Sequence, residues 1–229
     1  REAIRIGSSL QEGGYHPGTD VFDLLSGAAS EIRMLNEFGV KQARTMADAV
    51  GDAVNDKAPD MSVPFGFHAI DQHLRIESGS VTIIGARPGM GKTSFMLSSA
   101  WRQVNAGHRP YLVEMEMKDR NLGRRLVCGE TGVSVWKAKH KQLSRTEDAL
   151  LAKWHVENGE TLSRLIVNEA STMRVSSLAA HLDRAKRKDG IDVVWIDYIG
   201  LLQPSEKQRP GYDRMTAISN ELRILSKDL

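Results

Sequence analysis

The chain has 229 residues, of which 41% are hydrophobic and 26% charged, proportions that are ordinary for a soluble globular protein with its own core. Its 31 Lys and Arg against 29 Asp and Glu leave a formal charge of +2, which excludes a histone-like protein but allows a local basic loop that binds nucleic acid. A single cysteine, Cys128, excludes an internal disulfide framework and a multi-cysteine metal site, and apolar runs of a few residues exclude a membrane-spanning helix. We expect a cytoplasmic protein with no membrane partner and with Cys128 buried on a helix.

Residues 1–57 are predicted to form a helical linker region. Apolar residues recur there at helical spacing in two stripes, Val21, Leu25, Ala28, Ile32 and Leu35 in the first and Met46, Ala49, Val50, Ala53 and Val54 in the second. Helices this short cannot bury such stripes alone, so they pack either on the core of their own chain or on a neighbouring subunit. Because the chain begins at Arg1 and ends at Leu229 inside an apparently helical stretch, we expect a fragment of a longer protein.

A connecting loop is predicted at 58–67, where two prolines and a glycine interrupt regular structure. Beyond it, at 68–229, strands and helices alternate, which indicates an α/β domain with a mostly parallel sheet. Strands are predicted at 81–84, 110–115, 165–167 and 191–196, and helices at 91–105, 119–130, 144–154, 178–185 and 212–229. Ser144 and Glu147 have the spacing of a capping box at the start of the third of these helices.

The most specific motif is Ala-Arg-Pro-Gly-Met-Gly-Lys-Thr at 86–93, a phosphate-binding loop between a predicted strand and a predicted helix, with Ala86 in place of the usual first glycine. Two glycines allow the backbone to turn so that successive N–H groups face a phosphate, and the helix N-terminus adds partial positive charge. We expect Lys92 to lie between the β- and γ-phosphates and Thr93 to offer its hydroxyl to Mg²⁺. The predicted ATP-binding residues are Arg87, Pro88, Gly89, Met90, Gly91, Lys92, Thr93 and Ser94.

Acidic residues follow two further predicted strands. Asp197 ends an apolar strand in the Walker B pattern, and in a parallel sheet it emerges beside the phosphate-binding loop, where it would hold Mg²⁺ together with Thr93. Glu116 lies just past the strand at 110–115, where a carboxylate can polarise the water that attacks the γ-phosphate. Glu114 competes for that role, because it is two residues earlier and faces the same side if the strand continues.

These motifs, with Met-Glu-Met at 115–117 and Asp-Tyr-Ile-Gly-Leu at 197–201, resemble the RecA-like motor domain of DnaB-type replicative DNA helicases. The resemblance is strongest at 63–229, and residues 1–57 are similar to the end of the family's N-terminal region and its linker helix. It implies an ATP-dependent helicase subunit in a hexameric ring, with ATP and Mg²⁺ at subunit interfaces and 5′ to 3′ movement on single-stranded DNA. It also implies that Glu116 and Lys92 are catalytic, that the linker helix packs on the adjacent subunit, and that primase and a helicase loader are partners.

The loop at 203–214 follows the Walker B strand and in ring motors faces the central channel. Lys207, Arg209 and Arg214 are therefore candidate DNA-binding residues, although an ordinary solvated loop accounts for them equally well. The sequence stops before the strands that carry the family's polar sensor, main DNA-binding loop and arginine finger. Because an arginine finger is worth about 10³–10⁵ in rate, we expect the 229-residue chain alone to hydrolyse ATP poorly and not to unwind DNA.

Two other functions stay open at this point. The first is another RecA-like ATPase, such as a recombination mediator or a clock-type ring. Such proteins resemble this chain in the phosphate-binding loop and the Walker B strand, but less well at residues 86–88 and in the linker helices. A non-motor protein in which bound nucleotide only holds an assembly together is the second alternative. Glu116 argues against the latter, because a pure binder needs no carboxylate aimed at water.

Overall fold

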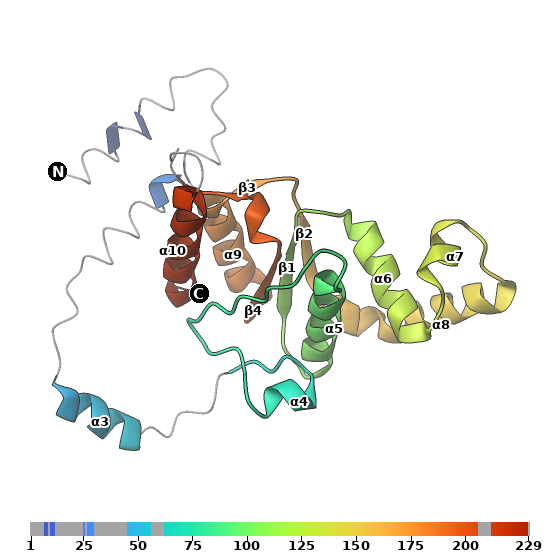
Figure 1. Ribbon diagram of the computed structural model, residues 1–229, viewed down its shortest axis with the longest axis horizontal. Helices are drawn as coiled ribbons and strands as arrows, with labels where there is room; N and C mark the ends of the chain where they lie inside the picture. Colours follow the sequence, from blue (N-terminus) through green and yellow to red (C-terminus); the bar gives the residue numbers. More distant parts are fainter. Residues whose placement is uncertain are drawn as a thin grey trace.

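The computed structural model describes residues 45–55, 62–205 and 212–228, together with isolated positions before residue 30 (Figure 1). The first predicted helix, around 21–35, and the basic segment at 206–211 therefore lie wholly or largely outside the described residues. Within the part of the chain that is described, no helix combines the length and the apolar character needed to cross a membrane.

The centre of the fold is a three-stranded parallel sheet in the order β2–β1–β4 (Figure 1). Strand β1 spans Pro110–Glu114, β2 spans Ile166–Glu169 and β4 spans Val193–Asp197. A second parallel pair joins β3 (Met173–Arg174) to β5 (Leu202–Gln203). The apolar runs at 110–115, 165–167 and 191–196 predicted β1, β2 and β4, and the parallel pairing of these strands confirms the α/β fold. All five residues of β1 are buried, as expected for a central strand covered on both faces.

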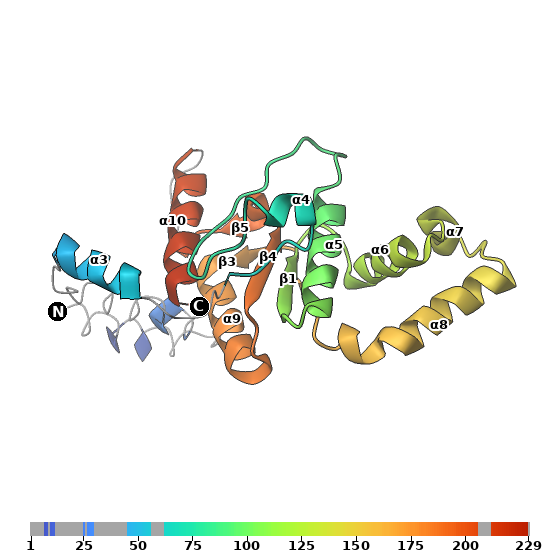
Figure 2. The ribbon, with the colours of Figure 1, turned by 90° about the horizontal axis from the view of Figure 1, so that it is seen from below.

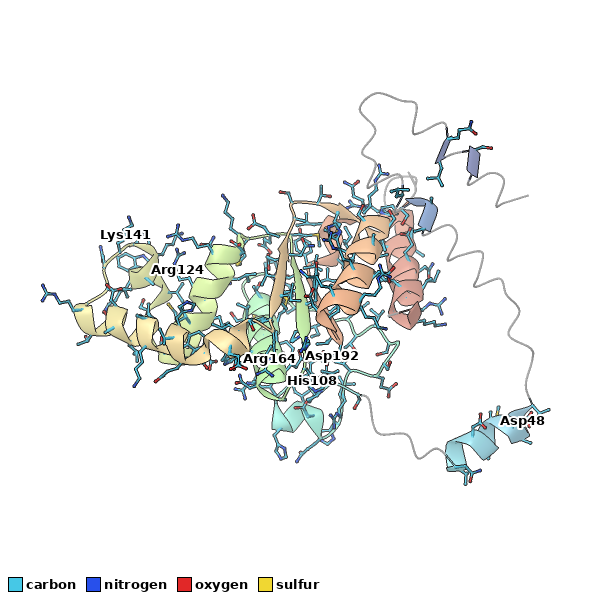
Figure 3. All side chains as sticks on the ribbon, turned by 180° about the vertical axis from the view of Figure 1, so that it is seen from behind. Asp48, His108, Arg124, Lys141, Arg164 and Asp192 are labelled. Carbon is cyan, nitrogen blue, oxygen red and sulfur yellow. The ribbon has the colours of Figure 1, made fainter. Side chains whose placement is uncertain are left out.

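The strand register brings the acidic residues to one edge of this sheet. Glu114 at the end of β1 lies opposite Glu169 of β2 and Asp197 of β4. At the other edge, His108 and Asp192 precede β1 and β4, and their side chains lie next to each other with Nδ1 and Oδ2 2.9 Å apart (Figure 3). A side-chain contact thus joins the amino ends of β1 and β4, whereas the acidic residues Glu114, Glu169 and Asp197 lie at the carboxyl ends.

Helices cover both faces of the sheet (Figures 1 and 2). On one face, α5 and α6 share a core cluster with Leu112 of β1 and Trp195 of β4. On the other, α9 and α10 pack against Tyr111 and Val113 of β1. Their bounds are Lys92–Asn105 for α5, Asp119–Thr131 for α6, Val175–Asp189 for α9 and Tyr212–Asp228 for α10, close to the predicted ranges. Cys128 is buried on α6 as predicted, and this burial raises the pKa of its thiol.

Helices α7 (Val135–Lys139) and α8 (Arg145–Leu162) extend away from the sheet beyond α6 (Figure 2). The predicted capping box is present: the Ser144 hydroxyl accepts from the Glu147 N–H, and the Glu147 carboxylate accepts from the Ser144 N–H. The Ser144 N–H, the Lys137 ammonium of α7 and the Ser144 hydroxyl all donate to the Glu147 carboxylate, and these hydrogen bonds lower its pKa to about 2. The α7 turn itself was not predicted, because its short sequence has no helical periodicity to detect.

Helix α3 spans Met46–Asn55, in agreement with the second predicted stripe. Its first turn is capped by reciprocal hydrogen bonds: the Thr45 N–H donates to the Asp48 carboxylate, and the Asp48 N–H donates to the Thr45 hydroxyl. The Thr45 hydroxyl and N–H both donate to the Asp48 carboxylate, and this lowers its pKa. None of its residues is buried, and Figure 1 shows it apart from the sheet and the other helices. The apolar stripe of α3 is therefore not used by the core of the same chain.

The segment at 81–84 corrects one prediction. It forms no strand; Val81, Ile83 and Ile84 are 44%, 68% and 40% exposed, and a cavity of about 840 Å³ lies between this segment and β4. An apolar run becomes a strand only where neighbouring strands complete its hydrogen bonds and side chains cover it. Among the described residues β4 pairs only with β1, and no strand lies on the far side of the segment.

The segment at 62–67 qualifies a second prediction. Its backbone is irregular, as expected for a connecting loop, except for an isolated bridge between Val63 and Ile76. It is nevertheless part of the core, because Val63 and Phe65 are buried beside α5 and β4. The Phe65 N–H donates to Asp71, which lies in the short helix α4 (His68–Asp71). The packed domain therefore begins before residue 68.

Candidate nucleotide-binding site

The phosphate-binding loop occupies the turn between the irregular segment at 81–84 and α5. Gly89 and Gly91 have φ values of +78° and +92°, in the left-handed region that residues with a side chain rarely adopt. A Cβ at either position would meet no atom within 4 Å, so the backbone conformation, and not space, requires glycine. The turn is closed by a hydrogen bond from the Met90 N–H to the Arg87 carbonyl. Arg87, Pro88, Met90 and Ser94 are exposed around it.

Lys92 is the first residue of α5, and Gly91 is its N-cap. The Lys92 ammonium donates to the carbonyl of Ala86 at 3.1 Å, so it folds back over the loop and not along the helix. This position places a cation above the turn whose backbone N–H groups and helix N-terminus already favour an anion. The predicted pairing of glycine-rich turn, lysine and helix start is present in the structure.

Thr93 and Asp197 are brought together although they are 104 residues apart. The Thr93 hydroxyl donates to Asp197 Oδ2 at 2.6 Å, which joins the start of α5 to the end of β4. Asp197 is 5% exposed, and its peptide bond to Tyr198 is cis. A hydroxyl and a carboxylate are both oxygen ligands of the kind that Mg²⁺ prefers.

The fit to Mg²⁺ follows from the number of protein ligands. Among the described residues, no group of three or more His, Cys, Asp or Glu could hold a metal ion. Magnesium in nucleotide sites is held through one or two protein oxygens, with phosphate oxygens and waters completing the octahedron. The Thr93–Asp197 pair beside a phosphate-binding turn fits that ligand set, and it does not fit a dedicated all-protein metal cage.

The two competing glutamates have different environments. Glu114 is fully buried, and its Oε1 accepts hydrogen bonds at 2.8 Å from the N–H groups of both Glu116 and Met117. Burial raises the pKa of Glu114, against the opposing effect of these two hydrogen bonds. Glu116 lies on the bend that follows β1, with its side chain exposed at the carboxyl edge of the sheet. A carboxylate that must reach a water molecule is better placed at Glu116.

Of the predicted DNA-binding residues, only Arg214 is described. Its guanidinium donates to the carbonyl of Gly200 at 3.1 Å and to that of Leu202 at 2.6 Å. Arg214 therefore ties the start of α10 to the segment after β4, and a contact between Arg214 and DNA stays a prediction. Lys207 and Arg209 lie outside the described residues.

Sequence reasoning missed the close packing after Asp197. A Cβ on Gly200 would lie 2.6 Å from Cε2 of Tyr198, so the tyrosine ring lies directly against the glycine backbone. The short helix η1 (Ile199–Leu201) turns the chain there. The glycine two residues after the tyrosine was visible in the sequence, but its spacing alone does not reveal that a ring covers it.

The fold and this site define a P-loop nucleotide-binding domain with a RecA-like arrangement of strands and helices. Residues 62–229 match the DnaB-like helicase C terminal domain family, and the chain belongs to that family. Its fold is similar to a solved structure of a DnaB-like replicative helicase and its interactions with primase, with a TM-score of 0.69 and 20% identity over the whole chain and 54% of the other. A second solved structure, of an ATPase domain, is similar with a TM-score of 0.68 and 22% identity, over 82% of this chain and 68% of that one.

Three curated relatives are named as replicative DNA helicases, one of them as a probable plasmid replicative DNA helicase. Over the whole length of this chain, it is 28% identical to the replicative DNA helicase DnaB of Rhodothermus marinus and 24% identical to the replicative DNA helicase DnaC of Bacillus subtilis. It is 26% identical, over 93% of its length, to a probable plasmid replicative DNA helicase of Chlamydia psittaci. The chain spans 25%, 52% and 45% of these three relatives.

Proposed function

We propose that the chain is part of an ATP-dependent replicative DNA helicase subunit that hydrolyses ATP with Mg²⁺. The observation that carries this proposal is the 2.6 Å hydrogen bond between Thr93 and Asp197, which joins the phosphate-binding helix to the Walker B carboxylate. The names of the curated relatives support the replicative role, and the domain match covers most of the chain.

Each residue of the site has a separate task in this proposal. The backbone at 87–91 and the Lys92 ammonium bind the β- and γ-phosphates, and Ser94 lies in the first turn of the same helix. Thr93 and Asp197 would hold Mg²⁺, which would supply positive charge to neutralise the charge that develops on the transferred phosphoryl group. Glu116 accepts a hydrogen bond from the attacking water and takes up its proton as the water oxygen bonds to the γ-phosphorus. The bond from that phosphorus to the β–γ bridging oxygen breaks in the same displacement, and ADP leaves with the electron pair.

The assembly that we propose is a hexameric ring that moves 5′ to 3′ along single-stranded DNA, with ATP at the interfaces between subunits. The unused apolar stripe of α3 supports packing of this helix on a neighbouring subunit. Lys207 and Arg209 would contact DNA phosphates from the loop at 203–214. Primase and a helicase loader are the proposed protein partners; primase is a partner of the DnaB-like replicative helicase whose structure is similar.

The test is ATP hydrolysis by the full-length protein with and without single-stranded DNA. Lys92→Ala removes the phosphate-binding cation, and Lys153→Ala, on the exposed surface of α8, is the matched control. We expect hydrolysis stimulated by DNA in the parent and in the control, and none in Lys92→Ala. Hydrolysis indifferent to DNA would instead favour another RecA-like ATPase. Nucleotide binding without Lys92-dependent hydrolysis would favour the assembly protein.

A separate variant tests the DNA loop. Charge reversal of Lys207 and Arg209 to Glu should weaken single-stranded DNA binding and reduce its dependence on salt, because two phosphate contacts and their released counterions are lost. Unchanged DNA affinity would show that this loop is ordinary solvated surface, without affecting the assignment of the nucleotide site.

A further inference from the structure

Glu114 is a buried acidic residue to which the proposed chemistry gives no task. It is 0% exposed, it sits at the end of the central strand, and its Oε2 is a buried oxygen without a hydrogen-bond partner. Burying a carboxylate is costly when its oxygens are not fully satisfied. Because Oε2 carries this cost, the presence of a glutamate has to be explained by what its other oxygen, Oε1, binds.

The position of Glu114 follows from the alternation of β1. Leu112 packs with α5, and residues two apart face the same side of a strand, so Glu114 points to the face that carries the phosphate-binding helix. Asp197 is opposite Glu114 in the register, and it holds the Thr93 hydroxyl on this face. The buried Glu114 carboxyl therefore lies on the same face of the sheet as the Thr93–Asp197 pair.

The hydrogen bonds of the backbone show what Glu114 holds. The sheet ends here: the Met115 N–H donates to the Asp197 carbonyl, and the Ala170 N–H donates to the Glu114 carbonyl. The chain then bends, and the next two N–H groups, of Glu116 and Met117, both donate to Glu114 Oε1 at 2.8 Å. One side-chain oxygen thus replaces the strand partners that these two groups have lost, and it fixes the bend that carries Glu116.

We propose that Glu114 is a positioning residue, which clamps the bend after β1 through Oε1 so that the Glu116 carboxylate is held toward the attacking water. The inference rests on the proposed function, because it assigns to Glu114 the orientation of the residue that polarises water. The rate of the chemical step is sensitive to displacements of about 1 Å in the reacting groups. If the bend is no longer held by Glu114, the Glu116 carboxylate shifts and kcat falls, while the affinity for nucleotide stays the same.

The experiment compares two substitutions of Glu114 in the full-length protein, with kcat and KM for ATP and nucleotide affinity as readouts. Glu114→Gln keeps an oxygen that can accept both N–H groups, and we expect kcat within about threefold of the parent. Glu114→Leu has no acceptor, and we expect kcat to fall at least tenfold with KM and nucleotide affinity within about twofold. Val113→Ala, a buried change on the opposite face of the same strand, controls for loss of packing.

A double-mutant cycle separates positioning from a structural role. If Glu114 acts through Glu116, then Glu114→Leu in the Glu116→Gln background lowers the residual rate by less than twofold, because the group that it orients is already gone. Equal losses in both backgrounds, or a Glu114→Gln variant as slow as Glu114→Leu, would overturn the positioning role. If Glu114→Leu does not fold, Glu114→Ser, which is too short to bridge both N–H groups, replaces it in the cycle.

The failure of the proposed function has a different signature. Hydrolysis that persists in both Lys92→Ala and Glu116→Gln would refute the site itself, and the positioning role with it. Hydrolysis that is lost in both, together with a Glu114→Leu variant that keeps the parent kcat, refutes only the role of Glu114.

Discussion

Gln103 lets the structure be tested by a single buried substitution. It is 0% exposed on α5, its Nε2 donates to the Pro64 carbonyl at 2.8 Å, and its Oε1 accepts from the indole Nε1 of Trp195 at 2.9 Å. One side chain therefore joins the segment at 62–67, the phosphate-binding helix and the Walker B strand. Gln103→Leu preserves the approximate volume and removes both hydrogen bonds.

The expected loss follows from the two groups that would be left without partners. The Trp195 N–H is buried, and an unsatisfied buried donor costs about 1–3 kcal/mol. Residue Pro64 is half-buried, so we expect its carbonyl to recover part of the lost hydrogen bond from water and to add about 1 kcal/mol. The sum, about 2–4 kcal/mol, corresponds to a Tm lower by roughly 5–15 °C for a domain of this size.

Urea unfolding followed by circular dichroism and by tryptophan fluorescence measures this loss. We expect the midpoint of Gln103→Leu to fall by about 1 M with an unchanged slope. Gln142→Leu, an exposed glutamine in the turn before α8, is the matched control and should stay within about 0.5 kcal/mol of the parent. A Gln103→Leu midpoint equal to that of the control would refute the bridging role of this side chain.

Three further predictions concern the site and one helix. Thr93→Val, which removes the hydroxyl and keeps the shape, should lower Mg²⁺-dependent hydrolysis at least tenfold; unchanged Mg²⁺ titrations of activity would contradict its role. Gly91→Ala forces a side chain into φ +92° and should weaken nucleotide binding, measured with a fluorescent ATP analogue, whereas Gly129→Ala, within α6, should not. Glu147 has a pKa lowered to about 2, so its stabilising effect is complete above its usual pKa and is lost as pH falls toward 2. The difference in unfolding free energy between the parent and Glu147→Gln should therefore be constant from pH 7 to about 5 and shrink below that. A difference that grows on acidification would contradict a lowered pKa of Glu147 in the folded state.

The parts of the fold that could be predicted are those whose signal is local. The capping box of Ser144 and Glu147, the stripe of α9 and the glycine-rich turn before α5 each follow from residues within a few positions of one another. The end of β4 was also predictable, because an apolar run that ends in Asp197 needs no knowledge of its neighbours. Combined with the rule that parallel strands end at a common edge, these local signals predicted the main elements of the nucleotide site.

The parts that could not be predicted depend on distant partners. The run at 81–84 has the composition of a strand, yet whether it forms one is decided by pairing that its own residues do not encode. The segment at 62–67 has the composition of a linker, yet Phe65 is 2% exposed because a hydrophobic pocket formed by α5 and β4 covers it. The roles of Glu114 and Glu116 likewise separate only when the bend after β1 is seen, since two glutamates two residues apart look equivalent in an extended strand.

Arg214 shows how the Walker B strand and the predicted DNA loop are connected. From Asp197 the chain passes through η1 to β5, and Arg214 at the far side of the loop donates to the carbonyls of Gly200 and Leu202. Arg214 therefore holds the start of α10 beside the segment that follows Asp197. Substitution of Arg214 therefore removes these two hydrogen bonds as well as a positive charge. Weaker DNA binding by an Arg214 variant therefore has two explanations, the lost hydrogen bonds and a lost phosphate contact. Variants of Lys207 and Arg209 keep the Arg214 hydrogen bonds. If they show the same salt dependence of DNA binding, a lost phosphate contact is the cause.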